Sequence, residues 1–532
     1  METEPAADCA ACASGKPGAA GTVISRSREM KVMTIGVVVP VYRQIRSYVF
    51  ECFAALEAQE FRDFKVAVVL DGAGAETERA VREAVRRLTV PYEVIRRTKN
   101  MGFAHSLNEG FERLRDCPYI TWVSSDDRPL PHYLGRLHRA MLQAPPETVI
   151  VYSLYHHIDE RGRRLQKPAS HHDLMCGFMR RRKEEIMQVN FIGVSHLFKR
   201  EAYVRAGKYD PARGMVADHE FWMRLLRAGE ILFLPEYLFE YRLNGVYSNT
   251  TVTPEEKLHL DSMRASRDIR RRFGDIPKAT VILTAHNHER FVKRAVDSVL
   301  GQTLRDFHLV VIDDASSDRT YPIVYRCHDP RMMPVRLTSR RGKAAALGIG
   351  LELALGEYVL ELDGDDWLDP QALALLVREM ERQPPEVAAV YANQKIWHLE
   401  TNGAWREGPI LRGGPLRSKY EVLTRTVMPC PRLYRKQALE RIGGFPAKIA
   451  GQPCLPVDYL TMLLLAERYR FRWLDAPVYH RSVHGAAHGQ IHKRDYAAQR
   501  RLIVRHMLER WNSPYIPEFV EENGELTGLR LL

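Results

Sequence analysis

Short runs of β-branched and aliphatic residues alternate with segments of helical period along most of the chain. The first run, TIGVVVPVYRQ from Thr34, ends in polar residues. The segment that follows places its apolar side chains on one helical face: Val49, Phe50, Phe53 and Leu56. Buried strands that alternate with amphipathic helices predict an α/β fold with a mostly parallel, doubly wound sheet.

The same pattern occurs a second time, at an offset of about 240 residues. ATVILTAHNHE from Ala279 corresponds to the first run, and GQTLRDF from Gly301 corresponds to AQEFRDF from Ala58. Further pairs follow in the same order: KVAVVLDG and HLVVIDDASSD, PYITWVSSDDRPLP and EYVLELDGDDWLDP, ADHEFWMRLL and PVDYLTMLLL. This offset is too long for a solenoid unit and is typical of a duplicated domain.

The repeat divides the chain into two tandem domains, which we place at residues 31–252 and 277–490. The charged, helix-forming stretch 253–276 is expected to link them. Residues 1–30, rich in Ala, Gly and Ser, are expected to form a flexible tail, and residues 491–532 a helical extension.

The ordered phrases resemble the family 2 inverting glycosyltransferases with the GT-A fold, a Rossmann-like, mostly parallel sheet. The resemblance covers nearly all of residues 31–250 and 277–490 and rests on five motifs found twice. It implies a nucleotide-sugar donor of the UDP type, Mn²⁺ or Mg²⁺ as cofactor, and direct displacement at the anomeric carbon. The acceptor would be a glycan or a lipid-linked sugar in polysaccharide or cell-surface glycan synthesis.

Asp71 in the first copy, and Asp313 and Asp314 in the second, stand where the second strand ends. Ligands of open α/β sheets bind outside the carboxyl ends of the strands. A carboxylate there can accept hydrogen bonds from a base or a ribose, and the resemblance assigns this position to the donor nucleotide. A turn-forming Asp is the alternative interpretation of each residue taken alone.

A pair of adjacent carboxylates follows another apolar strand in each copy. The first copy has Asp126 and Asp127, and the second has Asp365 and Asp366 preceded by Asp363. Mg²⁺ and Mn²⁺ prefer oxygen ligands, commonly one or two carboxylates together with substrate phosphates. The cluster resembles the family's DXD element, which implies that Asp126 and Asp363 contact the donor and that Asp127, Asp365 and Asp366 bind metal. A solvated acidic turn is the alternative.

Asp218 in ADHEFW and Asp458 in PVDYLT resemble the family's catalytic base. An acceptor hydroxyl is a poor nucleophile, so a positioned carboxylate must take its proton during attack. Both residues also suit the start of a helix, which is compatible with catalysis.

His484, in YHRSVHG, matches the family's late histidine and is a candidate metal ligand, although an exposed histidine would look the same in the sequence. Arg242 and Arg481 lie in the corresponding segments of the two copies. Because Arg suits bidentate phosphate binding, both are candidate ligands of the diphosphate.

The net charge of +12 and the pI of about 9.2 suit an anionic ligand without selecting one. No apolar run reaches the 18 to 20 or so residues of a bilayer span, and no secretory signal is visible, so a cytoplasmic location is the default expectation. The basic stretch 493–511 could lie on an anionic membrane surface, which would make the protein peripheral at the inner face of the membrane. Packing of its apolar stripe on the second domain is the favoured interpretation.

Besides a glycosyltransferase with one or two active sites, the sequence allows two other classes of protein. One is a non-catalytic protein that binds nucleotides or carbohydrates through degenerate sites; both copies retain an acidic pair and a base Asp, which argues against it. The other is a sugar nucleotidyltransferase, which would need a Gly-rich phosphate loop where PVYRQ and TAHNH stand. No aromatic-basic motif supports nucleic-acid binding.

Overall fold

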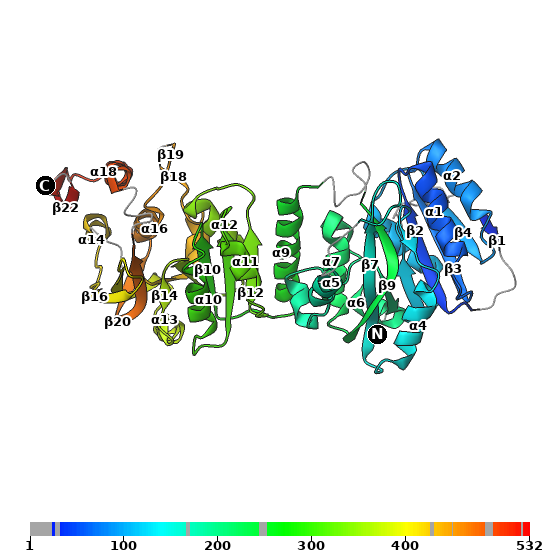
Figure 1. Ribbon diagram of the computed structural model, residues 1–532. Helices are drawn as coiled ribbons and strands as arrows, with labels where there is room; N and C mark the ends of the chain where they lie inside the picture. Colours follow the sequence, from blue (N-terminus) through cyan, green and yellow to red (C-terminus); the bar gives the residue numbers. More distant parts are fainter. Residues whose placement is uncertain are drawn as a thin grey trace, which may run out of the picture. The chain divides into compact units, whose positions relative to one another are not determined.

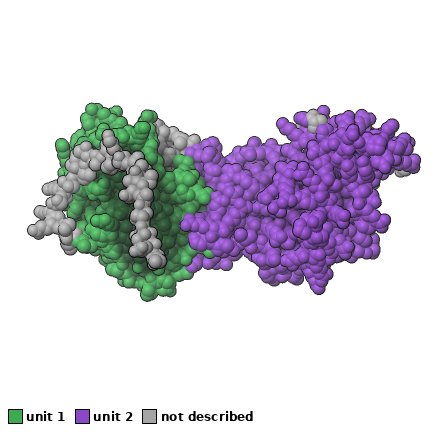
Figure 2. Space-filling view, turned by 180° about the vertical axis from the view of Figure 1, so that it is seen from behind, with its two compact units in different colours: residues 1–180, 191–252 green, residues 181–190, 253–532 purple. Residues whose placement is uncertain are grey.

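The computed structural model describes residues 24–26, 32–165, 171–243, 253–425, 430–449, 451–484, 493–522 and 525–532. Tertiary contacts divide the chain into two compact units, coloured green and purple in Figure 2. Unit 1 comprises Met1–Arg180 and Phe191–Val252. Unit 2 comprises Arg181–Asn190 and Thr253–Leu532, so it includes the helical stretch that the sequence places between the domains.

Unit 1 alternates strands and helices through most of its length (Figure 1). Its elements are β1 (Ile24–Arg26), β2 (Ile35–Val41), α1 (Arg46–Glu57), β3 (Phe64–Asp71), α2 (Ala75–Val85), β4 (Tyr92–Arg97), α3 (Phe103–Arg113), β5 (Tyr119–Trp122), β6 (Arg128–Pro129), α4 (Tyr133–Gln143), β7 (Thr148–Ile158), α5 (His171–Met179), β8 (His196–Lys199), α6 (Arg200–Ala206), the 3-10 helix η2 (Pro211–Val216), α7 (Ala217–Leu225) and β9 (Glu230–Arg242).

The strands of unit 1 form one mixed sheet in the order β1-β4-β3-β2-β5-β8-β7-β9-β6. Strands β4, β3, β2 and β5 run parallel, so their carboxyl ends lie at one edge. Strand β8 is antiparallel to both of its neighbours, and β9 runs parallel to β7. Strand β1 lies within the stretch expected to be a flexible tail and pairs with β4; residues 1–23 and 27–31 of that stretch lie outside the described residues.

Unit 2 repeats this order of elements. It contains η1 (Lys183–Met187), α9 (Glu255–Arg272), β10 (Ala279–Ala285), α10 (Val292–Leu300), β11 (Phe307–Asp313), α11 (Thr320–Tyr325), β12 (Met332–Arg336), α12 (Lys343–Leu353), β13 (Tyr358–Asp363), β14 (Trp367–Leu368), α13 (Ala372–Glu381), β15 (Val387–Leu399), β16 (Trp405–Leu411), α14 (Lys419–Thr424), β17 (Arg432–Arg435), α15 (Lys436–Arg441), β18 (Lys448–Ile449), β19 (Gln452–Pro453), α16 (Val457–Ala466), β20 (Arg470–Val483), α18 (Lys493–Arg510), β21 (Pro517–Glu522) and β22 (Glu525–Leu531).

The main sheet of unit 2 has the order β12-β11-β10-β13-β17-β15-β20-β14, with β16 paired to β15. Strands β12, β11, β10 and β13 are parallel, and β17 is antiparallel, as in unit 1. The two mixed, mostly parallel sheets with their helices confirm the predicted pair of α/β domains of GT-A type.

Apolar side chains bury both faces of each sheet, and close helix packing brings the site-forming loops to the sheet edge. A Cβ on Gly110 of α3 would lie 2.5 Å from Val38, and one on Gly350 of α12 would lie 2.3 Å from Ile282. These two glycines therefore let the helix sit directly on the central strand in each unit.

The basic helix α18 packs on unit 2, as favoured from the sequence. Ile503, Val504, Met507 and Leu508 are buried in a cluster that includes residues of α14 and α16. Among the residues that the structure describes, no helix combines the length and apolar character needed to cross a membrane.

Candidate active site

The predicted acids that follow strands lie at the carboxyl edge of the parallel strands in each unit. Asp71 ends β3, and Asp126 and Asp127 follow β5, which lies one strand away across β2. Unit 2 repeats this arrangement at β11 and β13. Each unit therefore brings acids from two strands to one edge of its sheet, the edge at which the crevice that binds ligands lies in open α/β sheets.

Asp71 and Asp314 anchor equivalent loops. Asp71 accepts hydrogen bonds from the backbone N–H groups of Met101–Gly102, at 2.9 and 2.7 Å. Asp314 accepts the same pair of bonds from Arg341–Gly342, at 2.7 and 2.8 Å. Both carboxylates are buried. They hold the loop that opens α3 or α12 against the end of the second strand.

Asp313 offers an unused acceptor in unit 2. Its side chain is fully buried, and burial raises the pKa of its carboxyl above the ordinary value. One oxygen accepts from the Ser316 N–H at 3.3 Å, while Oδ1 has no partner. A buried acceptor without a partner is costly, so this oxygen suits the N–H donors of a bound nucleoside.

The second carboxylate of each acidic pair binds the last strand of its unit. Asp127 Oδ1 accepts from the Arg242 N–H at 2.9 Å, and Asp366 Oδ1 accepts from the Ser482 N–H at 2.7 Å. Asp366 Oδ2 also accepts from the Tyr479 hydroxyl at 2.6 Å. Burial, followed by the charge of the neighbouring Asp, raises the pKa of both carboxyls well above the ordinary value. Arg242 therefore corresponds in register to Ser482, not to Arg481.

The first carboxylate of the pair in unit 2 faces a histidine. Asp365 Oδ2 lies 3.0 Å from His484 Nε2, and the His484 ring stacks on Phe291 with centroids 4.5 Å apart. Burial favours a higher pKa for Asp365, but His484 and a second nearby histidine outweigh it and lower the pKa. Asp363 forms a 2.5 Å ion pair with Lys343.

The pair Asp365 and His484 fits a divalent ion that completes its coordination with substrate. Within the described ranges, no group of three or more His, Cys, Asp or Glu side chains is arranged to hold a metal by itself. Mn²⁺ and Mg²⁺ commonly take one or two carboxylates and fill the remaining positions with phosphate oxygens and water. A two-donor site beside the crevice matches that requirement.

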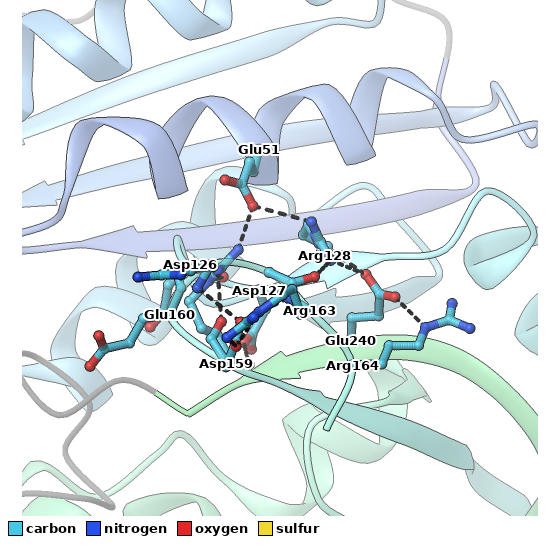
Figure 3. A network of polar contacts seen from close by, with 12 residues as sticks. Glu51, Asp126, Asp127, Arg128, Asp159, Glu160, Arg163, Arg164 and Glu240 are labelled. Carbon is cyan, nitrogen blue, oxygen red and sulfur yellow. Dashed lines mark hydrogen bonds and ion pairs between the residues drawn. The ribbon is translucent and has the colours of Figure 1, made fainter. Parts of the chain in front are cut away.

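In unit 1 the buried Arg242 contacts the acidic pair and the residues around it. Figure 3 labels Glu51, Asp126 and Asp159 of this network. The Arg242 guanidinium donates to the carbonyl oxygens of Asp126 at 2.8 Å, Asp159 at 3.1 Å and Glu160 at 3.2 Å. It also donates to Glu51 of α1 at 2.5 Å, and Arg242 is 0% exposed. Arg242, which was predicted to bind the diphosphate of the donor, thus makes its hydrogen bonds within the protein interior.

In unit 2 the arginine at this region comes from the first helix, α10, and not from the last strand. Arg294 of α10 occupies the position of Glu51, counted from the matching AQEFRDF and GQTLRDF phrases. Its guanidinium lies 3.4 Å from the Trp367 ring centroid and 4.2 Å from that of Trp405. Burial lowers the Arg294 pKa to about 10, against the opposing effect of Asp366 and Asp365. Sequence comparison alone did not identify this residue.

Arg481 is exposed, unlike Arg242. Its charge acts on Asp458, Asp363 and Asp366, which places it at the same crevice. Arg481 is therefore placed to meet an anionic ligand.

The candidate bases lie in the first turns of α7 and α16. Asp218 accepts from the His219 N–H at 2.7 Å, and Asp458 accepts from the Tyr459 N–H at 2.8 Å. A helix N-terminus favours the ionised carboxylate.

Charged side chains surround Asp458. Its Oδ2 lies 3.3 Å from Arg432 Nη1. Burial alone would raise the Asp458 pKa, but Arg432 and Lys343 outweigh it and hold the pKa below the ordinary value. Arg432 also donates to Glu361 at 2.7 Å, and the Tyr434 hydroxyl donates to the same carboxylate at 2.9 Å. The sequence did contain a signal for this cluster, because Glu361 is a charged residue within the otherwise apolar strand YVLELD. That signal did not enter the predicted site.

The matching positions in unit 1 are aromatic. Strand register equates Trp122 with Glu361 and His196 with Arg432. The His196 ring lies 5.2 Å from Trp122 and 4.7 Å from Trp222. Burial lowers the His196 pKa to about 3, so this ring is neutral.

Curated relatives include an uncharacterised glycosyltransferase of Rickettsia conorii, 21% identical over 65% of this chain and 63% of its own length. The hyaluronan synthase of Pasteurella multocida is 27% identical over 50% of this chain and 28% of its own length. The chondroitin synthase of Escherichia coli is 28% identical over 40% of this chain and 29% of its own length. The chain thus spans less than two thirds of the length of these relatives.

Among solved structures, S. aureus TarS 1–349 in complex with UDP-GlcNAc matches 43% of this chain and 66% of its own, with 22% identity and a TM-score of 0.34. The profile of glycosyl transferase family 2 matches residues 36–206 and 280–443, one stretch in each copy and together more than half of the chain. The chain therefore belongs to glycosyl transferase family 2.

Proposed function

We propose that the protein transfers sugars from UDP-sugar donors to a glycan or lipid-linked acceptor, with inversion and with a divalent metal, in polysaccharide synthesis. The observation that carries the proposal is that each unit has an acidic pair after a parallel strand and an Asp in the first turn of a later helix. In unit 2 Lys343 pairs with Asp363 and its charge acts on Asp458, which supports a shared site. The relatives named for hyaluronan and chondroitin synthesis support the substrate class.

In unit 2, Asp458 acts as the base. Its ionised carboxylate takes the proton of the acceptor hydroxyl as that oxygen attacks the anomeric carbon. Arg432 and Lys343 keep Asp458 ionised and hold it in place. The bond to the diphosphate breaks on the opposite side of the sugar, which gives inversion. In unit 1, Asp218 has the same role.

The metal would be held by Asp365 and His484, and its chemistry is to offset charge on the leaving diphosphate. Arg481 supplies a second positive charge at that position. Asp127 and Asp366, which the DXD resemblance assigns to the metal, also hold the acidic loop to the last strand through one carboxylate oxygen each. Asp126 remains the metal-facing candidate of unit 1.

The donor nucleoside would lie against the ends of β3 or β11. Asp313 Oδ1 accepts from the base, while Asp71 and Asp314 shape the loop beside it. Asp363, which pairs with Lys343 in this structure, would accept hydrogen bonds from the ribose hydroxyls.

The two units would act on different sugars, because the side chains beneath their bases differ in charge. Glu361 and Arg432 form a buried ion pair beneath Asp458, whereas Trp122 and His196 are neutral rings. A two-site enzyme that adds two sugars in turn fits this difference better than a single-site enzyme. A non-catalytic binding protein is disfavoured, because neither unit has lost its base.

The decisive test is transfer by the full chain with UDP-, GDP- and dTDP-sugars and hyaluronan or chondroitin oligosaccharides as acceptors. Transfer should need Mn²⁺ or Mg²⁺ and stop in EDTA. His484→Ala should raise the Mn²⁺ concentration needed by unit 2 about tenfold or more, the cost of one good ligand contact. His398→Ala, on β15, is the matched control. Full activity in EDTA would contradict the metal-dependent mechanism.

A further inference from the structure

The C-terminal helix α18 lies outside the segments matched by the family profile, yet it packs on the helix that carries the candidate base of unit 2. Its buried residues Ile503, Val504 and Met507 share one cluster with Val457 and Leu460 of α16. Asp458 stands between these two α16 residues. The contact therefore fixes α18 against the element that positions Asp458.

Two residues nearer the N-terminus of α18 contact residues that flank Asp458 in the sequence. Gln499 Oε1 accepts from the Leu455 N–H at 2.7 Å. The Arg500 guanidinium lies 5.2 Å from the centroid of the Tyr459 ring and donates to the carbonyl of Arg425. Arg500 is only 5% exposed, so this part of the helix is firmly seated.

Tyr496 lies one turn before Arg500 on the same face of α18. Because Gln499 contacts Leu455 and Arg500 contacts Tyr459, the turn that carries Tyr496 lies beside the start of α16, where Asp458 stands. The charges of Asp458, Arg432 and Lys343 act on the Tyr496 phenol, in agreement with this position. Burial and the Asp458 charge raise the Tyr496 pKa, so the hydroxyl stays protonated and can donate a hydrogen bond.

The helix that follows the last strand has a different place in the other copy. Helix α9 follows β9 as α18 follows β20, but α9 belongs to unit 2. There its residues Leu260 and Met263 pack in a cluster with Val310 and Val335 of β11 and β12. The placement of α18 over a base is therefore a feature of the second copy.

We propose that α18 forms one wall of the acceptor subsite of unit 2, and that Tyr496 binds the acceptor sugar next to Asp458. The phenol ring offers an apolar face to the sugar, and the hydroxyl hydrogen-bonds to one of its oxygens. Gln499 and Arg500 act as positioning residues that hold this turn of the helix. The inference rests on the proposed function of Asp458 as base.

The test uses the full chain carrying Asp218→Asn, so that only unit 2 transfers sugar to the hyaluronan or chondroitin oligosaccharides. Tyr496→Ala should raise the acceptor KM on the order of tenfold, while the Kd for UDP with Mn²⁺ and the hydrolysis of the UDP-sugar by water stay unchanged. Tyr496→Phe keeps the ring and should show a smaller rise in KM. Glu509→Ala, exposed on the same helix, is the matched control and should behave as the parent.

An unchanged acceptor KM in Tyr496→Ala would overturn the proposal, as would an equal loss of UDP binding, because that would indicate general damage to unit 2. Asp458→Asn separates this failure from failure of the proposed function. If Asp458→Asn leaves transfer intact, Asp458 is not the base and both ideas fall. If it abolishes transfer while Tyr496→Ala has no effect, only the role of α18 is wrong.

Discussion

Beneath Asp218, unit 1 packs Trp122, His196 and Trp222, whereas the positions matched by strand register beneath Asp458 hold Glu361 and Arg432. Both clusters are buried and both lie under a carboxylate in the first turn of a helix. The fold thus accepts either a neutral aromatic cluster or a buried ion pair beneath the candidate base. A buried charge is tolerated only with its partner, so the exchange must involve several residues together.

The cation near the acidic pair shows the same rule. Unit 1 combines Arg242 on the last strand with Glu51 on the first helix, and unit 2 combines Ser482 with Arg294 at the matching positions. At these two matched positions each unit has one guanidinium, on the last strand in unit 1 and on the first helix in unit 2. A guanidinium is kept at one of the two matched positions, while the residue that provides it and the net charge of the matched pair both differ.

The largest expected effect separates the two bases. Asp218→Asn and Asp458→Asn should each lower kcat for one sugar transfer by about 10²–10⁴-fold, because Asn cannot accept the proton. UDP binding should remain nearly unchanged. Incorporation of two radiolabelled sugars, measured separately, checks this. If one variant stops both transfers and the other stops none, a single unit is active and the comparison between sites loses its functional meaning.

A smaller effect tests the two guanidinium groups. Arg242→Met should lower the free energy of unfolding of unit 1 by about 3 kcal/mol, since it removes bonds to a carboxylate and to three carbonyl groups in the interior. Arg294→Met should cost about 1–2 kcal/mol, the value of a partly desolvated cation–π contact. Denaturant unfolding followed by tryptophan fluorescence measures both. Equal losses would show that the two arrangements are energetically equivalent.

The smallest expected effect concerns pH. Lys343 helps to hold the Asp458 pKa below its ordinary value, so Lys343→Met should raise that pKa. The base is lost when pH falls through its pKa; the acidic limb of kcat for unit 2 should therefore move to higher pH. The limb for unit 1, which has Phe103 at the matching position, should not move. The exposed Lys293→Met is the control, and an unmoved limb would contradict the electrostatic role of Lys343.

Several features of the site could be predicted from sequence because they are local. A carboxylate directly after a buried strand must lie at the edge of the sheet, which located Asp71, Asp126, Asp313 and Asp365. An Asp that opens an amphipathic helix must lie at the start of that helix, which located Asp458. The contacts of Arg242 could not be predicted this way, because register with another strand decides which residue meets the acidic pair.

The sequence by itself determined the duplicated α/β plan, the acidic pairs and the candidate bases, since these follow from hydrophobic period and from motifs within single loops. Only the tertiary structure decided which acid faces the crevice, which guanidinium lies beside it, and where α18 packs. Those outcomes depend on side chains far apart in the chain that share one low-dielectric space. There each buried charge needs a partner, and the partner's position is set by sheet register and helix packing rather than by sequence spacing.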